Sequence, residues 1–543
     1  MLLFAAPVVL SGCGSASASA AANPTGPPKH GGTVIVGLDQ EPSCINVTLV
    51  SCSMATAQMV AAPLWDSFIA SDDKGQRYPL LATDIPTVAN GQVKTVGSNM
   101  VVTMGIKPEA HWSDGVPITC EDFDFTWKTT MSNKWQIGSR IGWDKISKVD
   151  CADPHTIVAT FSEPYAYYLA VLGSAPFPKH DLEGKDFNTY LNDAAPVTSG
   201  PFRMTSWKRG VEIDFTRNTD YWNKGVNDLP YLNALKFIFI KSTNTLKVQL
   251  RTGEVDWINP PPDTSLLDEL KTYPRSKFQS VPGGYWENFA FQTQAKPMDN
   301  VDVRRAIAYA IDRKQLTDIV LRGQTSPLQS VLLPWQKDFF TPAWEQYTYS
   351  PDKVTEHLKA AGYTKSGTYW TKGGKPLEFT FKSTAGNSLR EKVAQLLQQN
   401  FKQVGIKMDI AMELPQVFFG QTTIQGQYQT GEWAWSSSLD PRLTEMFACD
   451  QIPSKSNNNE GKNNYRWCNQ EVTKLLHASD VEPDITKRGD LIKQAQVLMG
   501  NDVPLLPMYQ RPETVAYANR LQNIKDNPLG GQFWNVAEWW VTQ

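Results

Sequence analysis

The stretch near residue 400 constrains the fold more than any other, because it alternates strand and helix patterns over a short length. Residues 377–381 alternate apolar and polar side chains, as a half-buried strand does. In 389–404 the apolar residues recur at helical spacing, and 406–410 again has the character of a strand. Strand, helix and strand in this order predict a βαβ unit, so we expect an α/β fold.

Similar patterns recur along the rest of the chain. Its 543 residues can bury large cores, and we expect them to divide into more than one lobe. Further strands are expected at 31–37, 99–106, 211–216 and 235–241. Helices are expected at 54–62, after an N-cap at Thr119, and at 303–312, 351–362, 472–478 and 485–499.

The distribution of charge argues against a polyanionic partner. The formal net charge is -3, and the Lys and Arg residues are dispersed rather than clustered. A protein that binds nucleic acid needs a basic face. We therefore expect no nucleic acid among the partners.

The N-terminus has the character of an export signal. Its first 13 residues form an apolar run too short to span a bilayer as a mature helix. Leu10-Ser11-Gly12-Cys13 resembles the bacterial lipobox, in which the cysteine becomes the lipid-modified first residue. Residues 14–29 are rich in Ser, Ala, Gly and Pro, as a flexible tether is. We interpret 1–30 as signal and tether, with Cys13 anchoring the folded body outside the cytoplasmic membrane; the alternative is an apolar tail that ends at Cys13 by chance.

The other six cysteines are an even number, which in an exported chain indicates disulfides. Pairing of nearest neighbours is one of several possible connectivities. It would join Cys44 with Cys52, Cys120 with Cys151, and Cys449 with Cys468. No Cys-x-x-Cys spacing occurs, so zinc or redox use is the weaker interpretation and we expect no metal or cofactor.

The segment 431–441 is the candidate centre of function, because it places two indoles near a lone carboxylate. Trp433 and Trp435 are two residues apart, so on a strand both project to one face, where broad rings bury ligand surface and attract cations. Asp440 would then accept hydrogen bonds from an ammonium group. The alternative is that both rings fill the core and that Asp440 only begins an Asp-Pro turn.

An enzyme is the main competing class. Ser350-Pro351-Asp352-Lys353 matches the Ser-x-x-Lys of penicillin-binding proteins, but the companion Lys-Thr-Gly and Ser-Asp-Asn motifs are absent from the sequence. Ser350 as an N-cap with Pro351 at the first helical position explains the motif better. The six His residues are scattered without metal-ligand spacing. We therefore expect a protein that is not an enzyme.

Several short motifs follow one another along the chain. They are Trp112-Ser113-Asp114-Gly115, Glu121-Asp122-Phe123, Ser199-Gly200-Pro201-Phe202, Arg217-Asn218 with Tyr221-Trp222, Gly253-Glu254-Val255-Asp256, Val303-Arg304-Arg305-Ala306, Ala310-Ile311-Asp312-Arg313, Ala361-Gly362-Tyr363 and Asp440-Pro441. Each motif is weak by itself, but in this order they resemble the peptide/nickel (oligopeptide- and dipeptide-binding) family of extracellular solute-binding proteins of ABC importers. The resemblance extends from Gly31 to about Pro528.

The resemblance implies two α/β lobes that are joined by two crossings and close around a ligand like a hinge, with an extra subdomain in the first lobe. The crossings would lie near Gly284 and near Pro504. Lobe one would comprise 31–60, 196–285 and 505–543, its subdomain 61–195, and lobe two 286–504.

The resemblance also implies roles for particular residues. Asp440 matches the aspartate before proline that pairs with a peptide's α-amino group, Trp435 lies in the segment that lines the pocket, and 49–53 matches an extended edge that pairs with the ligand backbone. The candidate ligand-binding residues are Asp440, Trp435, Trp433, Leu49, Val50, Ser51, Ser53, Tyr285 and Trp286. Arg390 and Arg442 are candidates for the partner of the ligand carboxylate.

The function that the resemblance implies is that of the lipid-anchored, monomeric substrate-binding component of an ABC importer, which delivers peptides to membrane permease subunits. The same scaffold also serves nickel chelates, haem and oligosaccharides. The many Trp and Tyr residues would suit sugar rings, and an oligosaccharide needs no carboxylate for an ammonium group.

Overall fold

The computed structural model describes residues 27–52, 54–260, 268–414, 417–457, 461–527 and 531–542. The predicted lipidation site Cys13, most of the predicted tether and the candidate ligand residue Ser53 lie outside these ranges. Within them, no helix is both long enough and apolar enough to cross a membrane.

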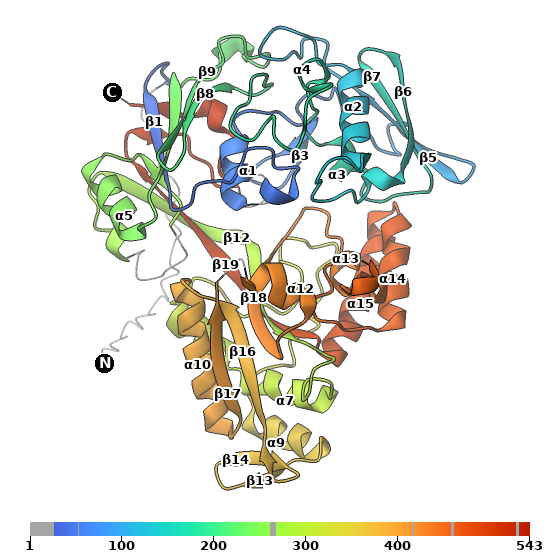
Figure 1. Ribbon diagram of the computed structural model, residues 1–543, viewed down its shortest axis with the longest axis vertical. Coiled ribbons are helices and arrows are strands. Elements are labelled where there is room, and N and C mark those ends of the chain that lie inside the picture. Colours follow the sequence, from blue (N-terminus) through green and yellow to red (C-terminus); the bar gives the residue numbers. More distant parts are fainter. Residues whose placement is uncertain are drawn as a thin grey trace, which may run out of the picture.

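A mixed sheet of ten strands, counted over the described residues, runs through both lobes of the molecule (Figure 1). In spatial order its strands are β17 (Lys407–Glu413), β16 (Glu378–Thr384), β18 (Thr430–Ser436), β12 (Ser276–Phe291), β19 (Leu505–Ala518), β11 (Trp257–Ile258), β1 (Thr33–Leu38), β10 (Ala234–Phe239), β9 (Glu212–Arg217) and β8 (Phe202–Lys208). The α/β class and the two-lobed architecture expected from the sequence are confirmed.

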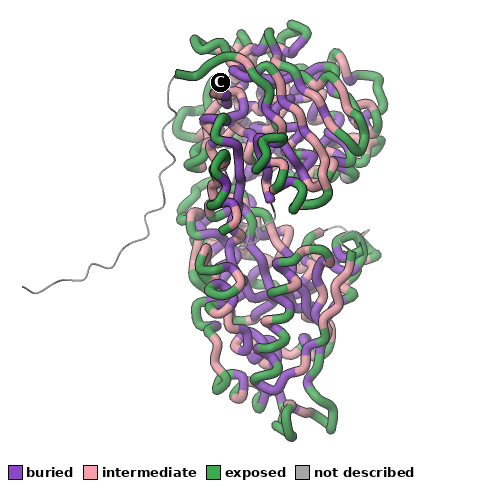
Figure 2. The backbone as a smooth tube through the Cα atoms, turned by 90° about the vertical axis from the view of Figure 1, so that its left-hand side faces the viewer, coloured by how far each residue is buried: buried purple, intermediate pink, exposed green. Residues whose placement is uncertain are grey.

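The two crossings between the lobes are the long antiparallel strands β12 and β19 (Figure 1). Figure 2, turned by 90°, shows the two lobes one above the other and joined along one side. The register of the two strands shifts between the pair Pro282–Pro512 and the pair Trp286–Gln510, on either side of Gly283 and Gly284. This shift lies where the first crossing is predicted, near Gly284. The second lies near 510–512 rather than near Pro504, because 505–509 pair with the lobe-two half of β12.

The βαβ unit predicted in lobe two is confirmed. β16 and β17 pair in parallel from Glu378–Lys407 to Thr384–Glu413, and α10 (Ser388–Val404) connects them. Helices α7 (Val301–Ala310), α9 (Pro351–Ala360), α14 (Gln470–Val481) and α15 (Ile485–Asp502) complete the lobe's large apolar core. The Ser350 hydroxyl accepts a hydrogen bond from the Lys353 backbone N–H at 3.3 Å, so Ser350 caps α9 as predicted.

The subdomain of lobe one is built on a four-stranded sheet. Its strands, in order, are β4 (Val93–Val96), β5 (Asn99–Gly105), β7 (Thr156–Phe161) and β6 (Ile146–Asp153). Helix α2 (Cys120–Met131) packs against this sheet and begins with the predicted capping box, in which the Thr119 N–H donates to the Asp122 carboxylate at 2.9 Å. The subdomain has its own core, so it is a separate packing unit.

The remaining elements are short. The helices are α1 (Ala55–Ala61), α3 (Tyr168–Leu172), α4 (Lys179–Leu182), α5 (Thr243–Thr252), α8 (Arg313–Gln315), α12 (Thr423–Gln425) and α13 (Thr444–Phe447), and the strands are β2 (Ile69–Ser71), β3 (Arg77–Pro79), β13 (Thr364–Ser366), β14 (Tyr369–Lys372), β15 (Lys375–Pro376), β20 (Leu521–Gln522) and β21 (Trp540–Val541).

The three disulfides follow the nearest-neighbour pairing, which is confirmed. They join Cys44 to Cys52, Cys120 to Cys151 and Cys449 to Cys468, with Cα–Cα distances of 5.3, 5.6 and 4.6 Å. Each lies within one lobe or subdomain, so none of them ties the two lobes together.

Candidate functional site

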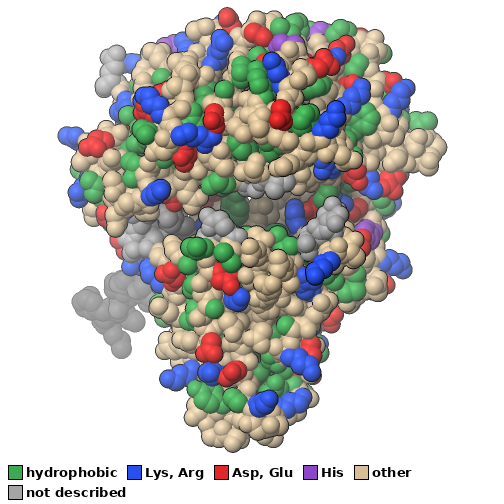
Figure 3. Space-filling view, in the orientation of Figure 1, with side chains coloured by type: hydrophobic (Ala, Val, Ile, Leu, Met, Phe, Trp, Pro, Cys, Tyr) green, Lys and Arg blue, Asp and Glu red, His purple; other side chains and the backbone are tan. Residues whose placement is uncertain are grey.

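Three neighbouring cavities share Ala62, the residue that follows α1. Figure 3 shows the surface hollowed between the two lobes. The central cavity has a volume of about 660 Å³ and is lined by lobe one and by Ser437–Leu439 of lobe two. The hinge cavity, of about 330 Å³, reaches Gly284 and Tyr285 on β12. The apolar cavity, also about 330 Å³, lies within lobe one and its subdomain. Pockets of this size accommodate small organic ligands.

The lobe-one wall of the central cavity carries a buried carboxyl group, Asp66. Its Oδ2 atom accepts hydrogen bonds from the Tyr221 hydroxyl at 3.0 Å and from the Trp222 indole N–H at 2.9 Å. Burial raises the pKa of Asp66 to about 7, against the effect of these two donors. The motif Tyr221-Trp222 thus fixes one side of the cavity.

The lobe-two wall of the cleft is neutral and rich in hydroxyl groups. β18 ends at Ser436, and Ser437 and Ser438 come directly after it. Ser437 lines both the central and the hinge cavities. The Ser437 N–H donates to the Gly284 carbonyl at 2.7 Å, and the Ser438 carbonyl accepts from the Gln336 amide at 2.7 Å. These bonds hold the wall against the first crossing and against the core of lobe two.

Asp440 lies beside this wall but already has cationic partners. Its Oδ1 atom is 2.9 Å from Nη2 of Arg488 on α15, and its Oδ2 atom is 3.9 Å from Nη2 of Arg77 on β3. Arg77 lines the central cavity, whereas Asp440 is not among the lining residues of the three cavities. Burial raises the pKa of Asp440, although both arginines act in the opposite direction. The Arg77–Asp440 pair therefore connects the subdomain of lobe one to lobe two.

Other contacts join the lobes on the same side. The Ala166 N–H donates to the Asp480 carbonyl at 2.9 Å, and the Tyr167 hydroxyl donates to the Pro441 carbonyl at 3.2 Å. The guanidinium groups of Arg442 and Arg488 lie over the Tyr167 ring, at 6.0 and 5.3 Å from its centroid. Figure 1 shows α3, which begins at the next residue, facing α13 and α14 across the junction.

Several predicted ligand-binding side chains belong to the core instead. Trp433 is 2% exposed and stacks on Tyr465 with ring centroids 5.6 Å apart. Trp286 and Leu49 are each 1% exposed. Buried side chains of this kind stabilise the lobes and present no surface to a ligand in the cleft.

The two remaining aromatic candidates are more accessible. Trp435 is partly buried, and its indole N–H donates to the Tyr465 hydroxyl at 2.7 Å. Tyr285 is 39% exposed and lines the hinge cavity. Of the aromatic residues predicted from the sequence, Tyr285 is thus the one placed to contact a ligand in a described cavity.

In its described part, 49–52, the expected extended edge is not a strand. Val50–Cys52 form a short 3-10 turn, and the bridge at Leu49 pairs with Ile137 of the subdomain. The Cys44–Cys52 disulfide closes the chain into a loop at this point, which explains why the segment bends. Ser51 is exposed at this turn.

The two basic candidates for the ligand carboxylate are also engaged within lobe two. Nη2 of Arg390 lies 3.0 and 3.1 Å from the carboxylate oxygens of Glu287 on β12. Arg442 binds the carboxylate of Asp480, with Nη2 at 3.1 Å. Both arginines therefore serve the fold in this structure.

A second buried acid lies beside the Arg390–Glu287 pair. Glu432 on β18 is fully buried, and in the described part of the chain its two carboxyl oxygens have no hydrogen-bond partner. Burial, together with the nearby Glu287 carboxylate, raises the pKa of Glu432 well above its usual range. The raised pKa favours the neutral form of Glu432, and Arg390 is the cation hydrogen-bonded to the Glu287 carboxylate.

Sequence reasoning missed the small residues that shape the cleft. Ala62 and Ser437 carry no charge and match no catalytic or metal motif. Their signal is positional, since Ala62 ends a helix and the three serines end a buried strand. Among the described residues no group of three or more His, Cys, Asp or Glu side chains is arranged to hold a metal ion.

A family model for bacterial extracellular solute-binding proteins, family 5 Middle, matches residues 77–451. Among curated proteins, the oligopeptide-binding protein OppA of Bacillus subtilis is 25% identical over 549 residues, which cover 96% of this chain and 95% of the relative.

Two solved structures share the fold. The oligopeptide-binding protein AppA of Bacillus subtilis, in complex with a nonapeptide, has a TM-score of 0.78 and 22% identity, covering 95% of this chain and 100% of that one. The periplasmic EDTA-binding protein EppA has a TM-score of 0.85 and 23% identity, covering 95% of this chain and 98% of that one.

Proposed function

Because this chain belongs to the family 5 bacterial extracellular solute-binding proteins, we propose that it captures a peptide between its two lobes and delivers it unchanged to the permease of an ABC importer. The observation that carries the proposal is the central cavity, which is lined from both lobes and adjoins the hinge cavity at Gly284 and Tyr285 of the first crossing. A ligand held there would join the lobes and favour their closure.

The chemistry of the cleft supports binding rather than catalysis. The lobe-two wall offers serine hydroxyls and backbone groups, which can hydrogen-bond a peptide backbone without reading its sequence. OppA and AppA are named as oligopeptide-binding proteins, which makes peptides the first ligand class to test.

Calorimetry with synthetic peptides graded in length tests this proposal, and mass spectrometry of the mixture afterwards shows whether the peptides stay intact. We expect saturable binding and full recovery of the peptide. Cleaved peptide would indicate an enzyme, and absence of binding by every peptide would contradict the proposed ligand class.

A chelate or an oligosaccharide is the second candidate ligand. The neutral, hydroxyl-rich wall at Ser436–Ser438 does not require an ammonium group on the ligand. EppA, which has the same fold, is named as an EDTA-binding protein. The same calorimetry with metal chelates and oligosaccharides separates these classes from peptides.

We further propose that Cys13 is lipid-modified and that residues 14–30 tether the folded body to the outer face of the membrane. The four residues that end at Cys13 support this proposal by their resemblance to a lipobox. Metabolic labelling with a fatty acid should mark the wild-type protein and should not mark the Cys13→Ser variant.

We propose that Asp440 is the partner of the ligand's α-ammonium group. The ammonium group must then replace Arg77 at Oδ2 of Asp440. Arg77 belongs to lobe one, so it can separate from Asp440 when the lobes open. Arg488 belongs to lobe two and would remain bound to Oδ1.

We expect Asp440→Asn to weaken binding of a free-amine peptide by about 2 to 5 kcal/mol if Asp440 holds the ammonium group. N-acetylation of the peptide should then weaken binding to the wild type by a similar amount. It should cause no further loss in the variant, because both changes remove the same interaction.

Arg77→Ala is the control, since it removes the interlobe ion pair and leaves the carboxylate. Equal affinity of the wild type for free-amine and acetylated peptides would contradict this role of Asp440.

A further inference from the structure

The apolar cavity of lobe one has a lining suited to a hydrocarbon group. Its walls include Ile45, Val47, Trp143, Phe177 and Leu191, and no charged side chain is among the residues described around it. A charged group would lose its hydration there without gaining a partner.

Several polar groups around the apolar cavity are engaged within the protein. The Thr126 hydroxyl donates to the Asp122 carbonyl at 2.6 Å and accepts from the Phe177 N–H at 2.7 Å. The Trp65 indole N–H donates to the Val197 carbonyl at 3.3 Å. A polar side chain entering the cavity would find these groups already satisfied.

The apolar cavity lies beside the proposed ligand site. It shares Ala62, Trp65 and Ser174 with the central cavity, and it shares Gln58 and Ala62 with the hinge cavity. A ligand that lies in the central cavity would therefore be next to the lining of the apolar cavity.

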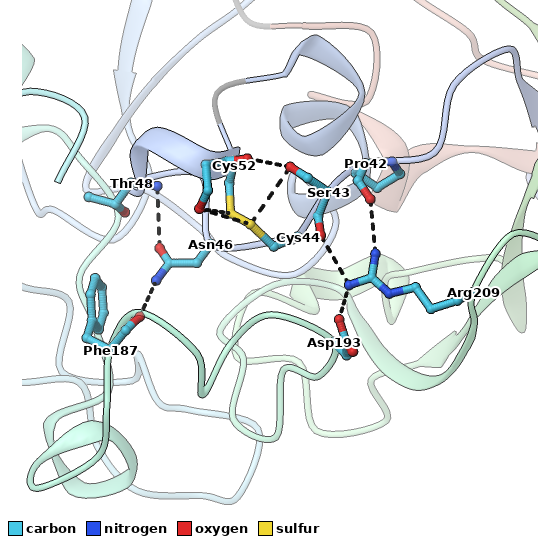
Figure 4. The surroundings of a disulfide bond; sticks show 10 residues. Pro42, Ser43, Cys44, Asn46, Thr48, Cys52, Phe187, Asp193 and Arg209 are labelled. Atoms are coloured by element: carbon cyan, nitrogen blue, oxygen red, sulfur yellow. Dashed lines mark hydrogen bonds and ion pairs between the residues drawn. A yellow bond between two sulfur atoms is a disulfide. The ribbon is translucent and has the colours of Figure 1, made fainter. Parts of the chain in front are cut away.

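One wall of the apolar cavity is the loop 45–48, which is held in place from two sides (Figure 4). At its base, the Cys44–Cys52 disulfide closes the loop, and Arg209 donates to the carbonyls of the residues before it, Pro42 and Ser43, at 3.2 and 3.1 Å. Arg209 is in turn paired with Asp193.

On the side of the subdomain, the same loop is bonded to two other segments. The Asn46 amide donates to the Phe187 carbonyl at 3.3 Å, and the Gly138 N–H donates to the Thr48 carbonyl at 2.8 Å. A wall fixed in this way keeps the cavity open before a ligand arrives, which reduces the ordering cost of binding.

Resting on the proposed function, we infer that the apolar cavity selects peptides that carry a bulky apolar side chain, aromatic or leucine-like, at one position. The cavity volume of about 330 Å³ suits one such group. The transfer of a side chain of this size out of water favours binding by about tenfold or more over alanine.

The test uses a set of peptides of one length in which a single position in turn carries Phe, Leu, Ala or Lys, with affinities measured by calorimetry. For the wild type, Phe and Leu at one position should bind about tenfold or more tightly than Ala, and Lys there should bind no better than Ala. At the other positions of the peptide, the affinities of the Phe, Leu, Ala and Lys peptides should differ less.

Ala175→Phe is the matched variant, because Ala175 lies in the cavity wall and its new ring would occupy the space. The preference for Phe and Leu should disappear in this variant, while the Ala peptide binds as before. Ala89→Phe is the control, since Ala89 is exposed in the same subdomain and lines none of the three cavities. Circular dichroism and the melting temperature check folding, and Val47→Trp at the exposed rim replaces Ala175→Phe if that variant does not fold.

Two outcomes would overturn the inference alone: peptides that bind without preference for an apolar residue at any position, or a preference that survives unchanged in the folded cavity variants. Failure of every peptide to bind would overturn the proposed function together with the inference.

Discussion

Replacing Ala62 by tryptophan should abolish ligand binding without unfolding the protein. Ala62 is exposed, has helical backbone angles and lines all three cavities, so an indole at this position would occupy the point where they meet. We expect the affinity for the tightest-binding peptide to fall by at least about 100-fold, or roughly 2.8 kcal/mol. Calorimetry on the variant measures this loss.

Ala89→Trp is the control for that experiment, since it adds the same indole to an exposed turn outside the cavities. Its affinity should match that of the wild type, and both variants should melt near the wild-type temperature. An Ala62→Trp protein that binds the peptide as tightly as the wild type would place the ligand somewhere other than the central cavity.

The second large effect concerns stability. Replacing Arg390 by leucine should destabilise the protein by about 3 to 5 kcal/mol, because it leaves the carboxylate of Glu287 buried without its principal partner. Glu287 is 1% exposed, and the nearest other guanidinium, that of Arg511, lies 3.8 Å from it. Chemical denaturation monitored by tryptophan fluorescence measures the change.

Two further variants test whether the unpaired Glu287 carboxylate causes that loss of stability. Arg390→Lys keeps a positive charge and should lose less stability than Arg390→Leu. The double variant Arg390→Leu, Glu287→Leu removes both charges and should recover most of the stability, because a buried ion pair costs nearly as much in desolvation as it returns. An Arg390→Leu protein as stable as the wild type would show that Glu287 does not depend on Arg390.

Features that depend on neighbouring residues in the chain could be predicted from the sequence. The alternation at 377–381 and the helical spacing at 389–404 identified the βαβ unit, because these periods follow from local geometry. The caps at Thr119 and Ser350 are likewise local. The disulfides joined nearest neighbours, a pattern that spacing suggests although it does not determine it.

The binding site could be predicted only in part, because it depends on contacts between distant segments. The charge of Asp440 suggests a ligand contact. Its partner Arg488, however, lies 48 residues further along the chain, and Arg77 belongs to the other lobe. Trp433 has the composition of a ligand contact, yet the register of β18 against β12 places it in the core.

The position of the second crossing was missed for a similar reason. The strand β19 runs without interruption from Leu505 to Ala518, so its composition gives no sign of where one lobe ends. The shift in register against β12 lies at Gly283 and Gly284, and Gln510 bonds to the Gly283 carbonyl across 227 residues of sequence.

The proposed function requires that a ligand binds between the lobes, beside Ala62, which all three cavities share. A crystal structure of the complex with the tightest-binding peptide tests this claim most directly. We expect ligand density in the central cavity, in contact with Ser437 of lobe two and with the neighbourhood of Ala62 in lobe one. Density confined to one lobe, or to a surface away from these residues, would contradict the account.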